Sequence, residues 1–270
     1  MRALAIDWSG AVHGAEGHIW LAEASEPGRL VRLECGRSRA AIGALLGQIH
    51  DDAVIGLDFA FGFPAWFADQ LGAPSAEAVW ACAAELGEGW LADCRPPFWG
   101  RPGRGRPALA RSAWRQTERS VPRTAGVAPK SIFQIGGPGA VGTGSIRGMP
   151  ILAALRAAGA CIWPFDPPGW PRVVEIYPRL LSGPVHKANP SARRRLLEQR
   201  FSELEAAHRR AAIESEDAFD AAVSALVMLE HAADLASLPP ESDPLVRLEG
   251  RIWYPDWRAE VRLPSEPGTA

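Results

Sequence analysis

Short hydrophobic runs separated by glycine-bearing turns open the chain, and they predict strands joined as antiparallel hairpins. The three predicted strands are residues 2–7, 17–24 and 29–35. Ser38 then precedes apolar residues at helical spacing, which predicts a helix that ends near His50. Residues 53–57 are aliphatic at every position, as is typical of a strand buried on both faces.

The rest of the chain predicts further helices and strands around a long irregular segment. Ser75 precedes a predicted helix that ends near Ala92, and another is predicted with Pro150 in its first turn and Gly159 beyond its end. The remaining predicted elements are strands within residues 160–165 and 171–178, helices at 191–213 and 216–235, and a strand-like piece at 250–253. We find no internal repeat and no linker. The sequence therefore predicts one α/β domain over residues 1–270, with a proline-rich tail at 239–270.

The irregular segment, residues 93–130, is interpreted as a basic insertion. From Arg95 to Lys130 it holds eight arginines and one lysine against one acid, Glu118, for a local net charge of +8. Phe98, Trp99 and Trp114 lie between the arginines, a composition suited to phosphates and stacked bases. The insertion is either a mobile lid or a binding loop, and the alternative is a solvated loop whose tryptophans pack on the core.

Composition narrows the class of protein. The 270 residues are 47% hydrophobic and carry a formal net charge of -2. This low net charge argues against a protein that binds long duplex DNA over its whole surface. No apolar run of about 18 residues and no signal peptide is found, so we expect a cytoplasmic protein with no membrane partner. The four cysteines are widely spaced and predict reduced thiols. The oligomeric state stays open, and a homo-oligomer is compatible with the sequence.

Five acidic residues are the candidate chemistry. Asp7 and Asp58 each follow a buried run, Glu175 lies between two aliphatic residues, and Asp217 and Asp220 share one face of a predicted helix. Each alone has a structural explanation, such as a turn or a helix N-terminus. Together they favour a site for Mg²⁺ or Mn²⁺, because ionised carboxylates are costly in apolar surroundings unless they are paired or bind metal.

A glycine-rich run, residues 136–148, is a weaker candidate. Its backbone N–H groups could bind phosphate, and its Arg147 is a candidate for contacting a substrate phosphate. The run matches neither common nucleotide-binding glycine motif, so a flexible turn that leads into the next helix is the alternative.

Several segments in a fixed order resemble the DUF429 family, whose members are described as predicted nucleases of the RNase H-like fold. The segments are AIDWSGA, VIGLDFAFGFP, GTGSIRGMPILAALRAAG, IWPFD, VVEIYPRLL, the HK of SGPVHKANP, DAFDAAVSALV and EGRIWYPD. The resemblance implies an RNase H-like mixed five-stranded sheet flanked by helices, with the Arg-rich segment as an insertion.

The resemblance also implies roles for individual residues. Asp7 and Asp58 match the acids on the first and fourth strands, and Asp217 and Asp220 match a late D-x-x-D helix; these four are the candidate metal ligands. Glu175 and Tyr177 match the E-x-Y-P motif, with Glu175 among the candidate catalytic acids and Tyr177 a candidate for substrate binding. Lys187 matches the downstream basic residue that would contact substrate.

The function predicted from these residues is metal-dependent hydrolysis of phosphodiesters in nucleic acid or nucleotides, with two divalent cations held by the carboxylates. Two alternatives remain. One is a nucleotide-binding ATPase or phosphotransferase of the actin and sugar-kinase type, although one copy of this pattern nearly fills the chain. The other is a binding protein of the same fold without catalysis.

Overall fold

The computed structural model describes residues 1–124 and 126–256. Within them, seven strands form one mixed sheet in the order β3-β2-β1-β4-β6-β5, with β7 paired to β6. The strands β1 to β3 are antiparallel neighbours, whereas β4 is parallel to β1 and the remaining pairs are parallel. The bounds are β1 Arg2–Asp7, β2 Trp20–Glu26, β3 Arg29–Glu34, β4 Ala53–Leu57, β5 Cys161–Ile162, β6 Arg172–Ile176 and β7 Ile252–Trp253.

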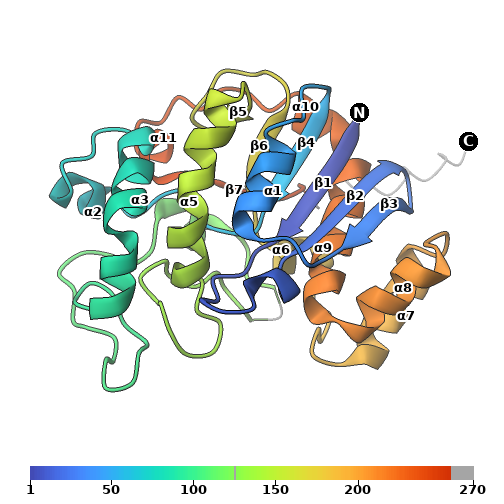
Figure 1. Ribbon diagram of the computed structural model, residues 1–270, viewed down its shortest axis with the longest axis horizontal. Coiled ribbons are helices and arrows are strands. Elements are labelled where there is room, and N and C mark those ends of the chain that lie inside the picture. The colour runs from blue at the N-terminus through green and yellow to red at the C-terminus, as the bar shows by residue number, and fades with distance from the viewer. Residues whose placement is uncertain (125, 257–270) are drawn as a thin grey trace, which may run out of the picture.

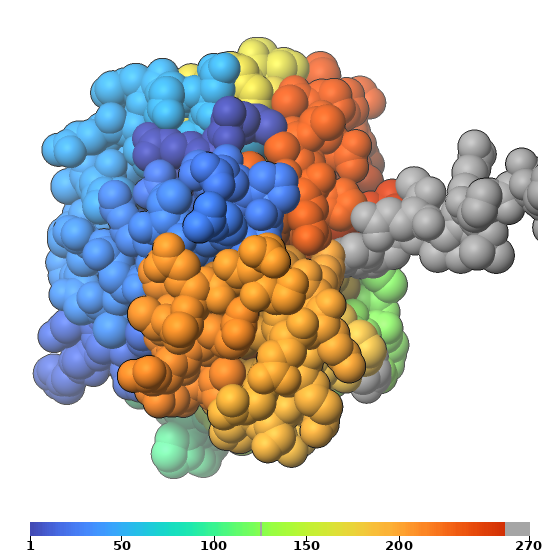
Figure 2. Space-filling view, turned by 90° about the vertical axis from the view of Figure 1, so that its right-hand side faces the viewer, coloured from blue at the N-terminus to red at the C-terminus, as the bar shows by residue number. Residues whose placement is uncertain are grey.

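Helices cover both faces of the sheet (Figure 1). Leu4 and Ile6 of β1 point to the face where α1 and α5 pack, and Ala3 and Ala5 point to the opposite face, covered by α9. The helices are α1 Arg39–Leu46, α2 Ala65–Gln70, α3 Ala76–Asp93, α4 Gln116–Ser120, α5 Gly142–Ala157, α6 Pro178–Ser182, α7 Pro190–Arg200, α8 Ala206–Glu214, α9 Glu216–Glu230, α10 Ala232–Ala236 and α11 Val246–Glu249, with a 3-10 turn η1 at Ala15–Gly17. Figure 2 shows the face where α7 and α8 lie side by side below the β2–β3 hairpin.

Gly56 in the middle of β4 allows α9 to lie close to the sheet. A Cβ at this position would lie 2.5 Å from the sulfur of Met228 on α9 and 3.0 Å from the Ile176 side chain on β6. Both neighbours are buried, so a larger residue would have to push the helix outward. The small residues of β1 and β4 thus set the distance between α9 and the sheet.

The five-strand count that the resemblance implied is wrong, because the predicted strand segments at 160–165 and 250–253 contain β5 and β7, which add two strands of two residues each to the edge beyond β6. The strands predicted at 2–7 and 53–57 are confirmed. The second strand begins at Trp20, three residues later than predicted, because η1 occupies the preceding turn.

Three helix predictions also need correction. Pro150 lies inside α5, which begins eight residues earlier at Gly142 in the glycine-rich run. The helix predicted at 191–213 is two helices, α7 and α8, because the chain turns at residues 201–205. The helix predicted at 216–235 is divided at His231 into α9 and α10. Of the predicted proline-rich tail, residues 257–270 lie outside the described residues.

Candidate functional site

Asp7 and Asp58 lie at the same edge of the sheet. Asp7 is the last residue of β1, and Asp58 directly follows β4, the parallel neighbour of β1. The strand register fixes the position of Asp58 relative to Asp7, since the backbone N–H of Asp58 donates to the carbonyl oxygen of Ile6 at 3.1 Å. Both side chains are half-buried, and within the described residues neither carboxylate has a hydrogen-bond or ion-pair partner. Two unpaired acids therefore meet at the carboxyl ends of adjacent strands.

The helix α9 brings the other two aspartates to this edge. Ser215 accepts a hydrogen bond from the N–H of Ala218 and fixes where the helix begins, so Asp217 lies in the first turn and Asp220 in the next. Asp220 is only 7% exposed, and its Oδ1 atom is buried without a partner in the described structure. Asp217 is half-exposed and its Oδ2 lies 3.2 Å from Nδ1 of His18. Asp220 is therefore the helix acid with an open ligand atom.

The pKa values of the inner acids reflect their burial and their mutual repulsion. Burial, followed by the charges of Asp58 and Asp220, raises the pKa of Asp7 well above its ordinary value. Burial and the Asp220 charge raise the pKa of Asp58 to about 8. Burial also raises the pKa of Asp220, to about 6, although Lys187 lowers it in part. Burial therefore disfavours the ionised form of all three carboxylates, and the charge of Asp220 adds to this at Asp7 and Asp58.

Lys187 supplies a positive charge to this cluster. Its ammonium contacts Oδ2 of Asp220 in an ion pair, and its side chain is 18% exposed. Burial alone would lower the pKa of Lys187, but Asp220, Asp58 and Asp7 together raise it above the ordinary value. The lysine that the sequence predicted as a substrate contact thus lies among the aspartates.

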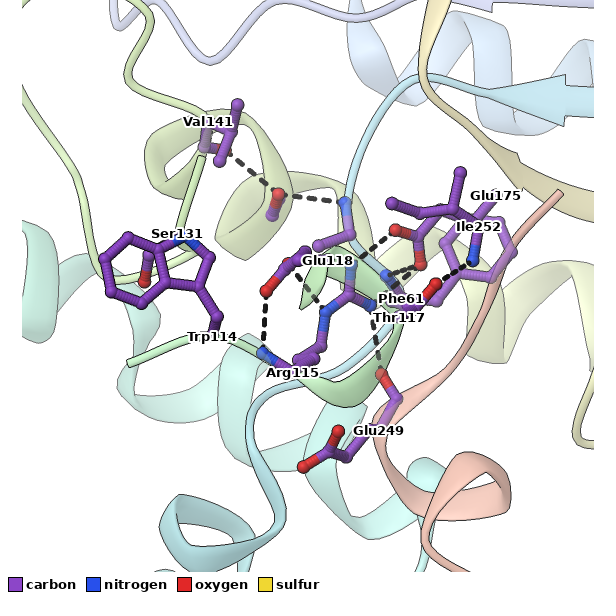
Figure 3. A network of polar contacts seen from close by, with 12 residues as sticks. Phe61, Trp114, Arg115, Thr117, Glu118, Ser131, Val141, Glu175, Glu249 and Ile252 are labelled. Carbon is purple, nitrogen blue, oxygen red and sulfur yellow. Dashed lines mark hydrogen bonds and ion pairs between the residues drawn. The ribbon is translucent and has the colours of Figure 1, made fainter. Parts of the chain in front are cut away.

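Glu175, in contrast, is committed to a buried arginine (Figure 3). The guanidinium of Arg115 donates to both Glu175 oxygens, at 2.5 and 2.8 Å, and its Nε donates to Glu118 at 2.9 Å. Glu175 also accepts from the N–H of Phe61 at 2.9 Å, just beyond Asp58. The predicted catalytic acid therefore has its oxygens occupied, and it fixes the loop after β4 and, through Arg115, the middle of the insertion.

Arg115 and Glu118 were not singled out from the sequence. Both are buried, and Arg115 also donates to the carbonyl oxygen of Glu249 at 3.0 Å. The Glu249 carboxylate in turn accepts from the N–H groups that open α2 and α4, at Ala65 and Gln116. The available signal was Glu118 itself, the only acid between Arg95 and Lys130 and three residues after an arginine.

A cavity of about 400 Å³ opens beside Asp58. Its wall includes Trp8 and Tyr177, Lys130 at the end of the insertion, and the start of α5. Burial and the Asp58 charge raise the pKa of Tyr177, so its hydroxyl stays protonated at neutral pH. The cavity is large enough for a small ligand whose reacting group lies against Asp58.

Arg147 lies on α5 and contacts protein groups rather than an open site. Its guanidinium pairs with both oxygens of Glu88 at 2.7 Å and donates to the carbonyl oxygen of Gly10. Gly10 lies so close to the start of α5 that a Cβ there would be 2.4 Å from the backbone nitrogen of Gly144. Arg147 and the glycines therefore hold the loop after Asp7 against α5.

The basic insertion contributes to the same cavity. Arg115, Glu118, Pro129 and Lys130 line it, while the arginines from 101 to 111 are exposed. Within the exposed part, the Arg106 guanidinium lies 4.4 Å from the centre of the Trp114 ring. The part of the insertion around α4 is thus anchored at the cavity by the Arg115 network.

Comparison with protein families gives a match over most of the chain. The family described as "Protein of unknown function (DUF429)" matches residues 6–244, which is most of the chain. The chain belongs to the DUF429 family. No curated protein and no solved structure matches it.

The described residues of this DUF429 protein have suitable donor atoms for a divalent cation. Asp7 and Asp58 are unpaired, and the buried Oδ1 of Asp220 lacks a partner, which is the oxygen chemistry that Mg²⁺ and Mn²⁺ prefer. In the described part of the chain, however, no three His, Cys, Asp or Glu side chains are already spaced around one metal position.

Among the described residues, no helix of the DUF429 protein has the length and apolar character needed to cross a membrane.

Proposed function

We propose that this protein hydrolyses phosphodiesters, with Mg²⁺ or Mn²⁺ bound by Asp7, Asp58 and Asp220. The observation that carries the proposal is the meeting of these carboxylates at one sheet edge, where burial and repulsion raise their pKa values. Groups whose pKa values are shifted by burial and by specific neighbours are common at functional sites. Asp217, paired with His18, is the outer member of the set.

The strand order supports an RNase H-like assignment within this proposal. The five longer strands follow the order β3-β2-β1-β4-β6, with three antiparallel strands and then parallel neighbours. The first and fourth strands end at Asp7 and Asp58, and a late helix carries Asp220. This is the arrangement that the DUF429 resemblance implies for a nuclease.

The residues around the cavity have distinct roles in the proposed reaction. A bound divalent cation would supply a Lewis acid and an activated water. Asp7 and Asp58 would hold it, while the protonated hydroxyl of Tyr177 and the ammonium of Lys130 would donate hydrogen bonds to phosphate oxygens in the cavity. Arg115 would keep Glu175, and with it the loop after Asp58, in place.

The size of the cavity favours a small substrate. A volume of about 400 Å³ accommodates a nucleotide or the end of a single strand, not a duplex. The formal net charge of -2 also fits a protein that does not bind nucleic acid over its whole surface. We therefore propose nucleotides or short single strands as the substrate class.

Binding without hydrolysis is the second candidate function. It is favoured by the ion pair between Lys187 and Asp220, since a lysine already neutralises one of the proposed metal ligands. In that case the cavity would bind a phosphorylated ligand, and the aspartates would have no catalytic role.

The test is hydrolysis of a short labelled single strand and of bis(p-nitrophenyl) phosphate, with Mn²⁺ or with chelator. We expect Mn²⁺-dependent cleavage by the wild type and a loss of about 100-fold or more in Asp58→Asn, since metal-assisted charge stabilisation supplies several kcal/mol. Asp69→Asn changes an exposed aspartate on α2 and is the matched control. Ligand binding without turnover by the wild type would favour the second candidate.

A further inference from the structure

The start of α5 presents unpaired hydrogen-bond donors at the cavity. The first turn of this 16-residue helix holds no acidic residue, and no side chain caps it. The N–H of Gly142 donates to the carbonyl oxygen of Gln134 at 3.0 Å, whereas within the described residues the N–H groups of Thr143 and Gly144 have no hydrogen-bond partner. Thr143 and Gly144 both line the cavity. Two unpaired N–H groups at the positive end of a helix are suited to an anion.

A buried tryptophan adds a third unpaired donor beside this helix end. Trp8 is 8% exposed, and its indole Nε1 is buried without a hydrogen-bond partner in the described structure. The ring atom next to Nε1, Cδ1, lies 3.6 Å from the position of a Cβ on Gly144, and Trp8 lines the cavity with that glycine. A buried indole N–H usually has an acceptor, and an unpaired one is costly. A ligand oxygen at the start of α5 would supply that acceptor.

Lys130 places a positive charge on the same wall of the cavity. Its side chain lies along the glycine-rich run, since Cε is 3.6 Å from the position of a Cβ on Gly139. Among the described residues its ammonium has no carboxylate partner. Glu118 and Glu175, which also line the cavity, share the cation of Arg115 instead. The charge of Lys130 is therefore left for a ligand.

We propose that Trp8, the first turn of α5 and Lys130 form a subsite for the terminal phosphate of the ligand. The indole N–H, the N–H groups of Thr143 and Gly144, and the ammonium suit the three free oxygens of a phosphate monoester, whereas a phosphodiester inside a strand offers only two. This gives the glycine-rich run a binding role that hydrolysis at the aspartates does not use. The anion subsite stands on its own contacts, and only the assignment of its phosphate to a nucleotide or strand end rests on the proposed function.

The first test measures whether a terminal phosphate is recognised. Thymidine dinucleotides with a phosphate at one end, at the other end or at neither are titrated calorimetrically into the full-length protein in chelator. We expect one of the phosphorylated forms to bind at least about tenfold more tightly than the unphosphorylated one, because hydrogen bonds to a charged group are strong. Inorganic phosphate should displace it, and chloride at the same ionic strength should not. Equal affinity of all three dinucleotides would overturn the inference.

Variants of the donors locate the subsite. Trp8→Phe keeps an aromatic ring but removes the indole N–H, and Lys130→Met removes the charge; each should weaken binding of the phosphorylated dinucleotide by about tenfold or more. Trp170→Phe is the matched control, because Trp170 precedes β6 at the sheet edge opposite Asp58 and does not line the cavity. Unchanged affinity in both donor variants would show that the phosphate binds elsewhere.

The indole N–H resonance of Trp8 reports on the contact directly. It is the tryptophan side-chain signal that is missing from the spectrum of Trp8→Phe, and saturating inorganic phosphate should shift it in the wild type and not in Lys130→Met at the same concentration. A Trp8 signal that phosphate leaves in place would contradict the subsite. If Trp8→Phe does not fold, the affinity of Lys130→Met decides, since Lys130 is exposed and its replacement leaves the core intact.

The outcomes separate this subsite from the proposed hydrolysis. Binding that depends on the terminal phosphate, without cleavage of any strand, leaves the subsite and removes the hydrolysis. Mn²⁺-dependent cleavage by a protein that ignores the terminal phosphate removes the subsite alone. Asp58→Asn should lose cleavage and still bind the phosphorylated dinucleotide at least as tightly as the wild type, because the Asp58 charge opposes an anion in the cavity. Weaker binding by Asp58→Asn in chelator would place the phosphate at the aspartates and overturn the inference.

Discussion

Asp58 is the residue where fold and proposed chemistry meet. It ends the central parallel strand, faces the cavity, and has a pKa raised to about 8 by burial and by the Asp220 charge. An aspartate in an unfolded chain has a pKa near 3.9, so the folded state holds the proton more tightly. The Asp58 carboxylate therefore costs folding free energy once the pH exceeds the unfolded value.

Asp58→Asn should consequently stabilise the metal-free protein in a pH-dependent way. Because the folded pKa is the higher one, stability falls as the pH rises from about 4 to about 8, and an asparagine avoids that loss. In chelator, we expect the variant to be more stable than the wild type by at least about 1 kcal/mol at pH 8, the worth of one pKa unit, and nearly equal at pH 4. Urea unfolding at the two pH values measures this, with Asp69→Asn as the control. A variant less stable than the wild type at pH 8 would show that Asp58 makes a stabilising contact instead.

Arg115 should be among the most sensitive residues of the insertion. Arg115→Met leaves Glu175 and Glu118 buried without their cation, which we expect to cost about 3–5 kcal/mol. Arg119→Met removes an exposed arginine on α4, the short helix that begins directly after Arg115, and should change the stability little. Thermal unfolding of both variants is the measurement, and equal melting temperatures would mean that the buried network does not anchor the insertion.

These residues also show what the sequence could reveal. Asp7 and Asp58 could be found because each ends a hydrophobic run, a local pattern. Arg115 and Glu175 are 60 residues apart, and no local pattern indicates that one neutralises the other. Glu175 was therefore grouped with the catalytic acids, because the sequence does not show that both of its oxygens accept hydrogen bonds from Arg115. Lys187 could be found only through the family resemblance.

At the scale of elements, α9 and β4 determine whether the acids can share a cation. The elements themselves were largely predictable, since β1, β4 and β6 are hydrophobic runs with a carboxylate inside or directly after each: Asp7, Asp58 and Glu175. The segments that hold β5 and β7 were also predicted as strands, but their length of two residues was not predictable, because two residues carry no periodicity. The early start of α5 was missed because its first turn is rich in glycine, a poor helix former. Gly142 is required here, since a Cβ on it would lie 2.0 Å from the carbonyl oxygen of Ile132.

Gly56→Ala tests the distance between these elements. The added Cβ would lie 2.5 Å from the Met228 sulfur, so we expect a loss of about 1–3 kcal/mol and weaker Mn²⁺ binding as α9 moves Asp220 away from Asp58. Gly89→Ala is the matched control, because no atom lies within 4 Å of its Cβ and alanine favours the helix α3. Unfolding by urea and Mn²⁺ titration report the two effects. Unchanged Mn²⁺ affinity in a destabilised Gly56→Ala would separate the packing of α9 from the site.

At the scale of the whole molecule, the site and the stability of the fold should be linked through a cation. Repulsion among the aspartates destabilises the metal-free chain, and a ligand that binds only the folded state stabilises it by an amount set by its concentration and affinity. At 100 times its dissociation constant that amount is about 2.7 kcal/mol, or roughly 5–10 °C in melting temperature for a chain of this size. The structure offers Asp7 as the residue that separates this linkage from an ordinary stabilising contact.

Asp7→Asn should therefore change the melting temperature in opposite directions with and without metal. The pKa of Asp7 is raised by burial and then by Asp58, so its charge costs stability at neutral pH, and the asparagine should melt about 2–4 °C higher in chelator, equivalent to about 1 kcal/mol. The same variant should lose most of the stabilisation by millimolar Mn²⁺, because a carboxylate ligand is gone. Asp52→Asn, an exposed aspartate just before β4, should match the wild type in both conditions. If Asp7→Asn melts lower than the wild type in chelator and gains as much from Mn²⁺, then Asp7 is a structural residue and neither the metal site nor the hydrolysis proposed for it stands.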